Sequence, residues 1–459
     1  MKILTSRTNK EEKLAKKCYF CKKIRIMDKQ KLYIETYGCQ MNFADSEIVA
    51  SILSHEYLLT SDEKEADLIL INTCSIRDNA EQRVLNRLTE LKALKKQRKN
   101  LRIGIIGCMA ERLKETLIEK NKVDLVVGPD AYRSLPQMLG ENTFNINVIL
   151  SETETYDDIT PIRYDTNGIS AFVSIMRGCN NFCSYCVVPY TRGRERSRHP
   201  QTIIEECRQL VAQGYKEVTL LGQNVNSYRY ENYTFPKLMQ AVAEISPLLR
   251  VRFATSHPKD LSDELLEVMQ AYPNICKSIH LPAQSGNNNV LQHMNRKYTR
   301  EWYLNRIAAI RRYMPDCAIS TDIIAGFCDE TIAEHQDTLS LMQEVGFEYA
   351  FMFKYSMREG TAAHRHMCDN VPEEEKIRRL EEIIALQQNL SLLSNKKDIG
   401  KTFEVLIEGC SKRSQDQLFG RNSQNKVVIF NKGNHQKGEY VKVHVYDCSA
   451  ATLFGEITD

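Results

Sequence analysis

The chain has 459 residues, of which 42% are hydrophobic and 26% charged, and its net charge is +3. This balance is typical of a globular protein of about three domains. No apolar run approaches the roughly 18 residues that span a bilayer, and the first residues are too charged for a secretory signal. We therefore expect no membrane-spanning segment and a cytoplasmic location, where thiols stay reduced.

The first 31 residues form a basic segment, with eleven Lys and Arg against three Asp and Glu. Two interpretations stay open: a solvated arm, or a weak electrostatic contact with RNA. Cys18 and Cys21 lie in this segment. They could bind zinc, but without a second pair we favour two free thiols.

Short apolar runs alternate with amphipathic helices over residues 32–147. The expected strands are Leu32–Tyr37, Leu68–Asn72, Arg102–Gly107 and Asp124–Gly128. This pattern predicts an α/β domain with a parallel sheet covered on both faces.

Residues 165–396 repeat the alternation six times, which predicts a partial (βα)6 barrel with functional residues in the loops after the strands. The expected strands are Ala171–Met176, Glu217–Leu221, Val251–Thr255, Ser278–Leu281, Ala318–Ile324 and Tyr349–Phe353. A closing helix is expected at Glu373–Asn395, with an apolar face formed by Ile377, Leu380, Ile384 and Leu390. Residues 398–459 contain short β runs punctuated by glycines, and these predict a small C-terminal β-barrel.

Fifteen cysteines are many for a chain in a reducing compartment, and they favour metal binding or catalysis over disulfides. Cys179, Cys183 and Cys186 form a C-x3-C-x2-C loop directly after the first strand of the barrel. Three close thiolates suit an iron–sulfur cluster and leave one iron open. Structural zinc is the alternative, but it needs a fourth ligand, and none stands nearby.

Cys39, Cys74 and Cys108 each fall one or two residues beyond an expected strand of the first domain, at spacings of 35 and 34 residues. Parallel strands end at one edge of a sheet, and right-handed crossovers bring successive ends together there. The spacing therefore predicts a second three-cysteine metal site, with unrelated structural cysteines as the alternative.

The C-x3-C-x2-C loop resembles that of the radical S-adenosylmethionine superfamily. The order of three dispersed cysteines, radical loop and small β-barrel resembles the methylthiotransferase family over residues 32–459. Within that family, the motifs favour the branch that modifies isopentenyl-type adenosines in tRNA. They are YGCQMN at 37–42, NTCSIRDNAEQR at 72–83, VPYTRGRERSR at 188–198, GQNVNSY at 222–228, HLPAQSGNN at 280–288, MNRKYTRE at 294–301 and STDIIAGF at 320–327. The chain departs from the family's GFPGET where it reads GFCDET, from Gly326 to Thr331.

The resemblance implies two [4Fe–4S] clusters, one on each cysteine trio, and S-adenosyl-L-methionine as co-substrate. It implies cofactor contacts at Tyr185, Gly222, Gln223 and Gly326. The implied reaction adds a methylthio group to C2 of N6-isopentenyladenosine at position 37, next to the anticodon. No catalytic side-chain nucleophile is expected, because the clusters and S-adenosylmethionine carry the chemistry.

The expected partner is the anticodon stem-loop of tRNA, which would be read by a C-terminal domain that resembles the RNA-binding TRAM domain. Residues 412–442 hold seven basic against two acidic side chains. The residues predicted to contact RNA are Arg192, Arg194, Arg196, Arg198, Lys412, Arg413 and Arg421. For the first four, a structural salt-bridge role stays open. We also expect a monomer, no membrane partner, and an electron donor such as flavodoxin or ferredoxin.

Three other functions stay open. Two lie within the family: methylthiolation of threonylcarbamoyladenosine in tRNA, or of an aspartate on a ribosomal protein. The third is a non-catalytic iron–sulfur RNA-binding sensor.

Overall fold

The computed structural model describes residues 29–74, 78–121, 123–140, 145–164 and 167–458. The chain divides into two compact units, with the boundary between Ile149 and Leu150. Most of the basic segment, with Cys18 and Cys21, lies outside the described residues, as do positions 75–77 of the NTCSIRDNAEQR motif.

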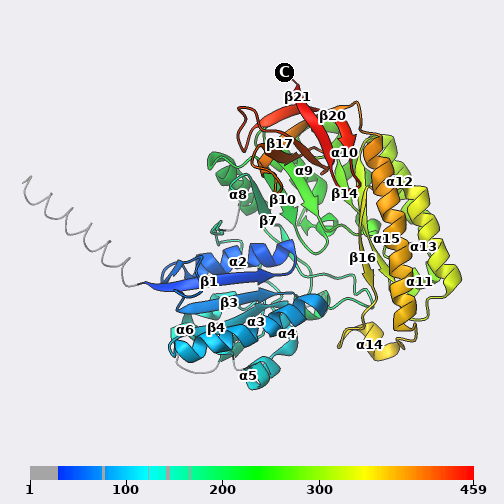
Figure 1. The fold of residues 1–459 in the computed structure, drawn as a ribbon. Helices are drawn as coiled ribbons and strands as arrows, with labels where there is room; N and C mark the ends of the chain where they lie inside the picture. Colours follow the sequence, from blue (N-terminus) through cyan, green and yellow to red (C-terminus); the bar gives the residue numbers. More distant parts are fainter. Residues whose placement is uncertain (1–28, 75–77, 122, 141–144, 165–166, 459) are drawn as a thin grey trace, which may run out of the picture. The chain divides into compact units, whose positions relative to one another are not determined.

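The first unit is built on a parallel sheet whose strands follow the order β2-β1-β3-β4-β5-β6 (Figure 1). The central strands are buried on both faces, as their unbroken apolar runs predict. The strands are β1 (Gln30–Tyr37), β2 (Tyr57–Leu59), β3 (Leu68–Thr73), β4 (Arg102–Gly107), β5 (Leu125–Val127) and β6 (Asn145–Asn147). The helices are α2 (Gln40–Leu53), α3 (Asp78–Gln97), α4 (Cys108–Leu113), α5 (Glu115–Asn121) and α6 (Leu135–Gly140), with the short turn η1 (Tyr132–Ser134).

The order of these strands reverses direction between β1 and β3. The chain leaves β1 toward β2 on one side and then returns to β3, β4 and β5 on the other. Such a reversal opens a crevice at the carboxyl ends of the two strands, where α/β sheets bind their ligands. The first unit therefore offers a ligand site at the end of β1 and β3.

The second unit begins with six parallel strands in two three-stranded sheets, β13-β10-β7 and β14-β15-β16. A parallel bridge between Val251 and Ile275 joins the two sheets, which confirms the predicted partial barrel. The strands are β7 (Ser170–Ser174), β10 (Glu217–Leu221), β13 (Arg250–Ala254), β14 (Ser278–His280), β15 (Ala318–Ala325) and β16 (Tyr349–Lys354). The covering helices are α8 (Pro200–Ala212), α9 (Phe235–Ala243), α10 (Asp263–Ala271), α11 (Asn288–His293), α12 (Arg300–Tyr313), α13 (Ile332–Val345), α14 (Ala362–His366) and α15 (Glu373–Lys396).

Shorter elements decorate the mouth of this barrel. Strand β8 (Met176–Arg177) pairs with β9 (Arg196–Ser197), and β11 (Arg229–Tyr230) pairs with β12 (Tyr233–Thr234). Single turns occur at α7 (Val188–Thr191), η2 (Val225–Ser227) and η3 (Pro258–Asp260).

Helix α15 packs along β16 and α13 through a face that is largely polar (Figure 1). The predicted apolar face is wrong at Ile377, which is exposed, but Leu380 and Leu390 are partly buried and pack against the core as predicted. The buried positions are Lys376, Arg379, Ile383, Gln387, Ser391 and Asn395. Their polar groups bind partners in the neighbouring strands and loops; for example, Gln387 donates to the Phe347 carbonyl at 2.9 Å and Ser391 to the Glu348 carbonyl at 2.8 Å.

The second unit ends in a closed β-barrel of order β17-β18-β19-β21-β20 around an aliphatic core. Its strands are β17 (Thr402–Cys410), β18 (Gln417–Arg421), β19 (Val427–Asn431), β20 (Tyr440–Cys448) and β21 (Leu453–Thr458). Strand β21 was not predicted, yet it closes the barrel by pairing with both β19 and β20.

Buried arginines at the start of β13 hold this small barrel against the larger one through hydrogen bonds. Arg250 donates to the carbonyls of Arg421 and Glu404, and Arg252 donates to the carbonyl of Asn422 at 2.8 Å. Arg252 also pairs with Glu217 of β10 at 2.7 Å. The contact is therefore specific hydrogen bonding to backbone rather than loose surface packing.

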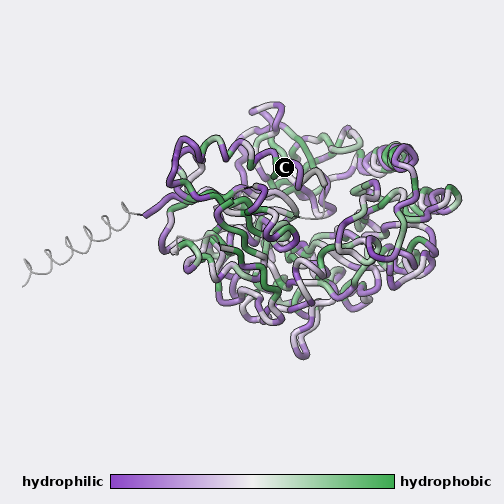
Figure 2. Tube along the Cα trace, turned by 90° about the horizontal axis from the view of Figure 1, so that it is seen from below, coloured by the Kyte–Doolittle hydropathy of each residue, from purple (hydrophilic) through white to green (hydrophobic). Residues whose placement is uncertain are grey.

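Hydrophobic residues run along the strands, and hydrophilic residues occupy the outer helices and loops (Figure 2). No helix in the described part of the chain has the length and apolarity needed to cross a membrane. The predicted α/β class, with a parallel-sheet domain, a partial (βα)6 barrel and a small β-barrel, is confirmed.

Candidate active site

The loop that carries Cys179, Cys183 and Cys186 follows β7 and β8 at the mouth of the barrel. Its entry needs glycine, because Gly178 has φ +78 and an added Cβ would lie 1.9 Å from the Arg194 carbonyl oxygen. The Cys179 amide donates to the Gly193 carbonyl at 3.1 Å, and the Cys186 amide donates to the Cys183 carbonyl at 3.0 Å. The backbone thus folds the three cysteines into one tight loop.

A distant segment, part of the MNRKYTRE motif, holds the far side of this loop. The Ser184 amide donates to the Met294 carbonyl at 3.0 Å, and the Asn295 side chain donates to the Phe182 carbonyl at 2.7 Å. Phe182 has φ +49, so this hydrogen bond supports a strained turn between the first two cysteines. The motif therefore shapes the cysteine loop.

The thiols of this loop are close enough to influence one another electrostatically. Burial, with a smaller contribution from the neighbouring Cys183, raises the pKa of Cys179 to about 11. The pKa of Cys186 is raised for the same two reasons. Free thiolates are therefore disfavoured together, and a cationic iron centre would offset both burial and mutual repulsion.

Six polar side chains around the mouth end in buried atoms that find no hydrogen-bond partner among the described residues. They follow the carboxyl ends of β7, β10 and β13, where a barrel binds its ligand. The atoms are Ser174 Oγ, Gln223 Oε1, Asn224 Oδ1, both side-chain atoms of Asn226, Ser256 Oγ and His257 Nε2. Buried polar groups normally have partners, so this ring indicates the site of a polar ligand.

His257 is held neutral at this ring. Burial, together with the smaller effect of the charges of Arg296 and Lys259, lowers its pKa to about 2. Nδ1 accepts from the Lys259 amide at 3.4 Å, so the ring proton sits on Nε2, which faces no described acceptor. His257 can therefore donate one hydrogen bond to a ligand without carrying charge.

The four residues predicted as cofactor contacts all lie at this mouth. Tyr185 stands in the cysteine loop, with its ring against Phe327 at 6.4 Å. Gly222 and Gln223 follow β10, and an added Cβ at Gly222 would lie 2.4 Å from Met176. Gly326 follows β15 with φ +71. Sequence reasoning missed Ser174, Ser256 and His257, and it quoted Asn224 and Asn226 only within the GQNVNSY motif. Ser174 ends β7, and the others lie in the segments that follow β10 and β13.

The GFCDET segment forms a tight turn although it lacks the proline and glycine of the family pattern. Asp329 adopts φ +62 where the family pattern has glycine. Its amide donates to Asn370 Oδ1 at 2.9 Å, and the Asn370 amide group donates back to Asp329 Oδ1 at 2.5 Å. Asp is among the few residues that tolerate this conformation, so the pair stabilises a turn that glycine would adopt freely.

The side chain of Glu330 holds the loop after β15 in place. Its Oε2 accepts from the Gly326 amide at 2.6 Å and from Arg379 of α15 at 2.9 Å. Both side chains of this ion pair are almost completely buried. Gly326 is thereby fixed despite the changed residues that follow it.

In the first unit, Cys39, Cys74 and Cys108 follow three neighbouring strands that pair in register. Tyr37 pairs with Thr73, and Thr73 pairs with Gly107, so the strand ends are level. An added Cβ at Gly38 would lie 2.7 Å from the Cys74 Cβ, which brings the Cys39 loop directly against Cys74. The cysteines therefore gather at the crevice between β1 and β3.

Two fully buried asparagines, Asn42 and Asn72, lock this edge. The Asn42 amide donates to Asn72 Oδ1 at 2.9 Å, and the Asn72 amide donates to the Asn42 carbonyl at 2.8 Å. The Cys39 thiol donates to Asn42 Oδ1 at 3.3 Å. Sequence reasoning quoted both asparagines within motifs but gave them no role.

Within the described residues, no three His, Cys, Asp or Glu side chains stand in the arrangement that holds a single metal ion. A [4Fe–4S] cubane makes a different demand, because each cysteine binds a different iron. Both trios supply the soft thiol donors that such a cluster requires.

The candidate RNA-binding residues differ in exposure. Arg192, Arg196 and Arg198 are buried, and Arg198 pairs with Glu206 at 2.8 Å. Their burial favours the structural role that the sequence left open. Arg194, Lys412 and Arg413 are exposed, whereas Arg421 pairs with Glu408 at 3.2 Å.

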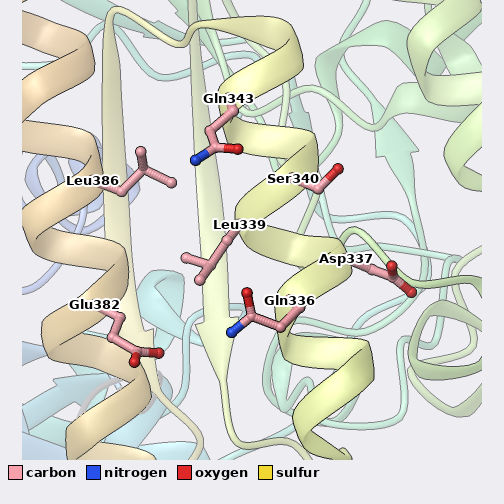
Figure 3. A pocket seen from close by; sticks show the side chains of 7 residues that line it. All are labelled: Gln336, Asp337, Leu339, Ser340, Gln343, Glu382 and Leu386. Carbon is pink, nitrogen blue, oxygen red and sulfur yellow. The ribbon is translucent and has the colours of Figure 1, made fainter.

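A shallow pocket of about 410 Å³ lies between α13 and α15 (Figure 3). Its lining is Gln336, Asp337, Leu339, Ser340, Gln343, Glu382 and Leu386. None of these residues belongs to the cysteine loop or to the ring of unpaired polar atoms. The pocket is thus separate from the candidate active site.

Three family models match the chain. They describe the uncharacterized protein family UPF0004 at residues 31–128, the radical SAM superfamily at 173–342, and the TRAM domain at 396–458. Among solved structures, the radical S-adenosylmethionine methyltransferase TsrM from Kitasatospora setae aligns with a TM-score of 0.54 and 13% identity, over 70% of this chain and 72% of that one. The cobalamin-dependent S-adenosylmethionine radical enzyme OxsB aligns at 0.53 and 13%, over 77% and 56%. These likenesses concern the fold alone.

The barrel, its cysteine loop and the C-terminal domain define a radical S-adenosylmethionine enzyme that carries a TRAM domain. Two curated relatives are tRNA-2-methylthio-N(6)-dimethylallyladenosine synthases. That of Bacteroides thetaiotaomicron is 60% identical over 94% of this chain and 96% of its own length, and that of Porphyromonas gingivalis W83 is 59% identical over 94% and 95%. The chain belongs to this family of tRNA methylthiotransferases.

The site fits the groups that the superfamily uses. The C-x3-C-x2-C thiols match an iron–sulfur cluster with one open iron. The ring of unpaired buried atoms matches S-adenosylmethionine, which offers amino, carboxylate, hydroxyl and purine groups.

Proposed function

We propose that this enzyme adds a methylthio group to C2 of N6-isopentenyladenosine at position 37 of tRNA, using two [4Fe–4S] clusters. One cluster is held by Cys179, Cys183 and Cys186, and the other by Cys39, Cys74 and Cys108. The observation that carries the proposal is the pairing of β1, β3 and β4, whose ends lie side by side. This pairing places Cys39, Cys74 and Cys108 at the same edge of the sheet.

The target C–H bond is unactivated, so ordinary acid–base chemistry cannot reach it. When bound, the cluster at Cys179, Cys183 and Cys186 would supply, with one S-adenosylmethionine, the radical chemistry that removes hydrogen from C2; the cluster at Cys39, Cys74 and Cys108 would supply the sulfur, and a second S-adenosylmethionine the methyl group. The task of the protein is to orient these groups and exclude water.

The residues of the barrel mouth divide this task. Ser256 and His257 offer donors after β13, and Gln223 and Asn224 offer amides after β10. Tyr185 provides an aromatic face within the cysteine loop. None of these side chains acts as a nucleophile in this proposal.

The RNA surface is proposed at Arg194 and at the TRAM residues Lys412 and Arg413. Their exposed charges suit phosphate contacts, and a single-stranded anticodon loop presents splayed bases to such a module. A monomer in the cytoplasm, reduced by flavodoxin or ferredoxin, is proposed as the working form.

The proposal is tested by anaerobic reconstitution of the enzyme with S-adenosylmethionine and dithionite. Three anticodon stem-loops are supplied, bearing unmodified, isopentenyl or threonylcarbamoyl adenosine, and the digested nucleosides are measured by mass spectrometry. We expect a methylthio mass increase only on the isopentenyl substrate. A product on the threonylcarbamoyl substrate, or on ribosomal protein, would transfer the proposal to another branch of the family.

Cysteine variants separate the roles of the two trios. Cys108→Ala should lower the rate of methylthiolation at least about a hundredfold, while 5′-deoxyadenosine still forms at the barrel. The matched control Cys410→Ala removes an exposed cysteine outside both trios and should leave the product unchanged. Full iron content without any 5′-deoxyadenosine in the unaltered enzyme would favour the sensor instead.

A further inference from the structure

Arg296 is a buried arginine at the cysteine loop, and only 8% of it is exposed. It lies just beyond α11, between Asn295, which supports the loop, and Lys297. Such a guanidinium always carries its charge, so its burial must be offset by neighbouring groups.

Every nitrogen of this guanidinium is fixed. Nε donates to Tyr298 Oη at 3.0 Å, and Nη2 donates to the Pro282 carbonyl at 3.0 Å. Nη1 donates to Cys183 Sγ at 3.3 Å and to Tyr185 Oη at 3.5 Å. The group that points at the cysteine thus has no freedom to turn away.

Among the described residues, Arg296 forms no ion pair: no Asp or Glu oxygen lies within 4.0 Å of its guanidinium. Its side-chain partners are Tyr298 Oη, Cys183 Sγ and Tyr185 Oη, and of these only Cys183 belongs to the trio that would bind the proposed cluster. A [4Fe–4S] cluster on three thiolates carries roughly −1 charge when oxidised and roughly −2 when reduced, which supplies the missing counter-charge.

We propose that Arg296 is a positioning residue that raises the reduction potential of the cluster at Cys179, Cys183 and Cys186 through its hydrogen bond to the Cys183 sulfur. Reduction adds one electron, from an external one-electron donor, to a centre that is already negative. The fixed cation stabilises the reduced state more than the oxidised state. Arg296 itself gains or loses no electron or proton.

The test replaces Arg296 by the neutral Arg296→Gln in the full-length, reconstituted enzyme. The potential is measured by a redox titration monitored by electron paramagnetic resonance, following the signal that changes when S-adenosylmethionine is added. We expect the reduction equilibrium constant to fall about tenfold, which is about 59 mV for one electron. Arg296→Lys, which keeps the charge but loses the fork of donors, should give a smaller fall.

The matched control is Arg300→Gln, four residues away. Arg300 donates to the Asp337 carbonyl at 2.7 Å and pairs with Glu344, so it holds α13 and not the cluster. Its loss should leave the potential unchanged.

An unchanged potential in a fully loaded Arg296→Gln enzyme would overturn the inference. So would loss of iron from both Arg296 variants, because the arginine would then assemble the cluster instead of tuning it. The inference rests on the proposed cluster but on no particular RNA. Absence of iron in the unaltered enzyme would therefore be a failure of the proposed function, which the same iron assay detects before any titration.

Discussion

At the scale of single residues, the mouth of the barrel holds side chains whose charge state depends on burial. His257 is neutral because burial lowers its pKa to about 2, whereas an exposed imidazole titrates near 6.5. Below pH 6.5 the unfolded chain therefore binds a proton that the folded chain refuses. Stability from this group is present above pH 6.5 and is lost as the pH falls toward 2.

We expect the free energy of unfolding to decrease by up to about 1.4 kcal/mol per pH unit below 6.5 through His257 alone. In His257→Asn, which keeps an acceptor for the Lys259 amide, thermal unfolding should depend less on pH between 6.5 and 5. Parallel pH profiles of the variant and the unaltered protein would show that His257 is not the buried base.

Asp329 makes a second prediction at this scale. Asp329→Ala keeps the left-handed backbone but loses the hydrogen bond from the Asn370 side chain, so it should destabilise the protein by about 1–2 kcal/mol. Asp329→Gly loses the same bond but relieves the backbone, and it should cost less. Denaturant unfolding compares the two, and a larger loss in the glycine variant would contradict this reading.

At the scale of elements, α15 is held by buried polar groups. Arg379→Met would leave Glu330 charged, buried and unpaired, at a cost of about 3–5 kcal/mol. The double variant Arg379→Met, Glu330→Met should recover much of that loss, because no isolated charge remains. Chemical denaturation of the four proteins in this cycle measures the coupling, and strictly additive losses would argue against it.

The same helix shows which features of the fold the sequence could not predict. Strands such as Arg102–Gly107 and Glu217–Leu221 were predicted at their observed bounds, because buried parallel strands are unbroken apolar runs. The buried polar residues of α15 could not be predicted, since Arg379 and Gln387 look solvent-facing until their partners are known. Strands β2, β6 and β21 were also missed; β6 reads Asn-Ile-Asn, and Gly455 and Glu456 interrupt β21, so neither of these two shows an unbroken apolar run.

The candidate site divides in the same way. Both cysteine trios were predicted, because the position of each cysteine after a strand is visible in the sequence. The burial of Arg192 and Arg198 was not predicted, because the sequence does not distinguish an arginine that binds RNA from one that forms a buried ion pair, as Arg198 does with Glu206. His257 and Arg296 were missed because their roles come from contacts between distant segments.

At the scale of the whole molecule, the contact between the two barrels of the second unit should affect the binding of tRNA. Arg252→Met removes the hydrogen bond to the Asn422 carbonyl and leaves Glu217 buried without its partner. We expect a lower melting temperature and a KM for tRNA raised several-fold, while S-adenosylmethionine cleavage without RNA keeps its rate. Steady-state kinetics with a full tRNA measures this, and an unchanged KM would mean that the TRAM domain binds RNA without this contact.

The central claim is that this chain holds two iron–sulfur clusters on two separate cysteine trios. Iron and sulfide analysis after anaerobic reconstitution, combined with Mössbauer spectroscopy, tests it most directly. We expect about eight irons per chain, and about four in a triple alanine variant of either trio. Eight irons retained after replacement of Cys39, Cys74 and Cys108 would contradict the account.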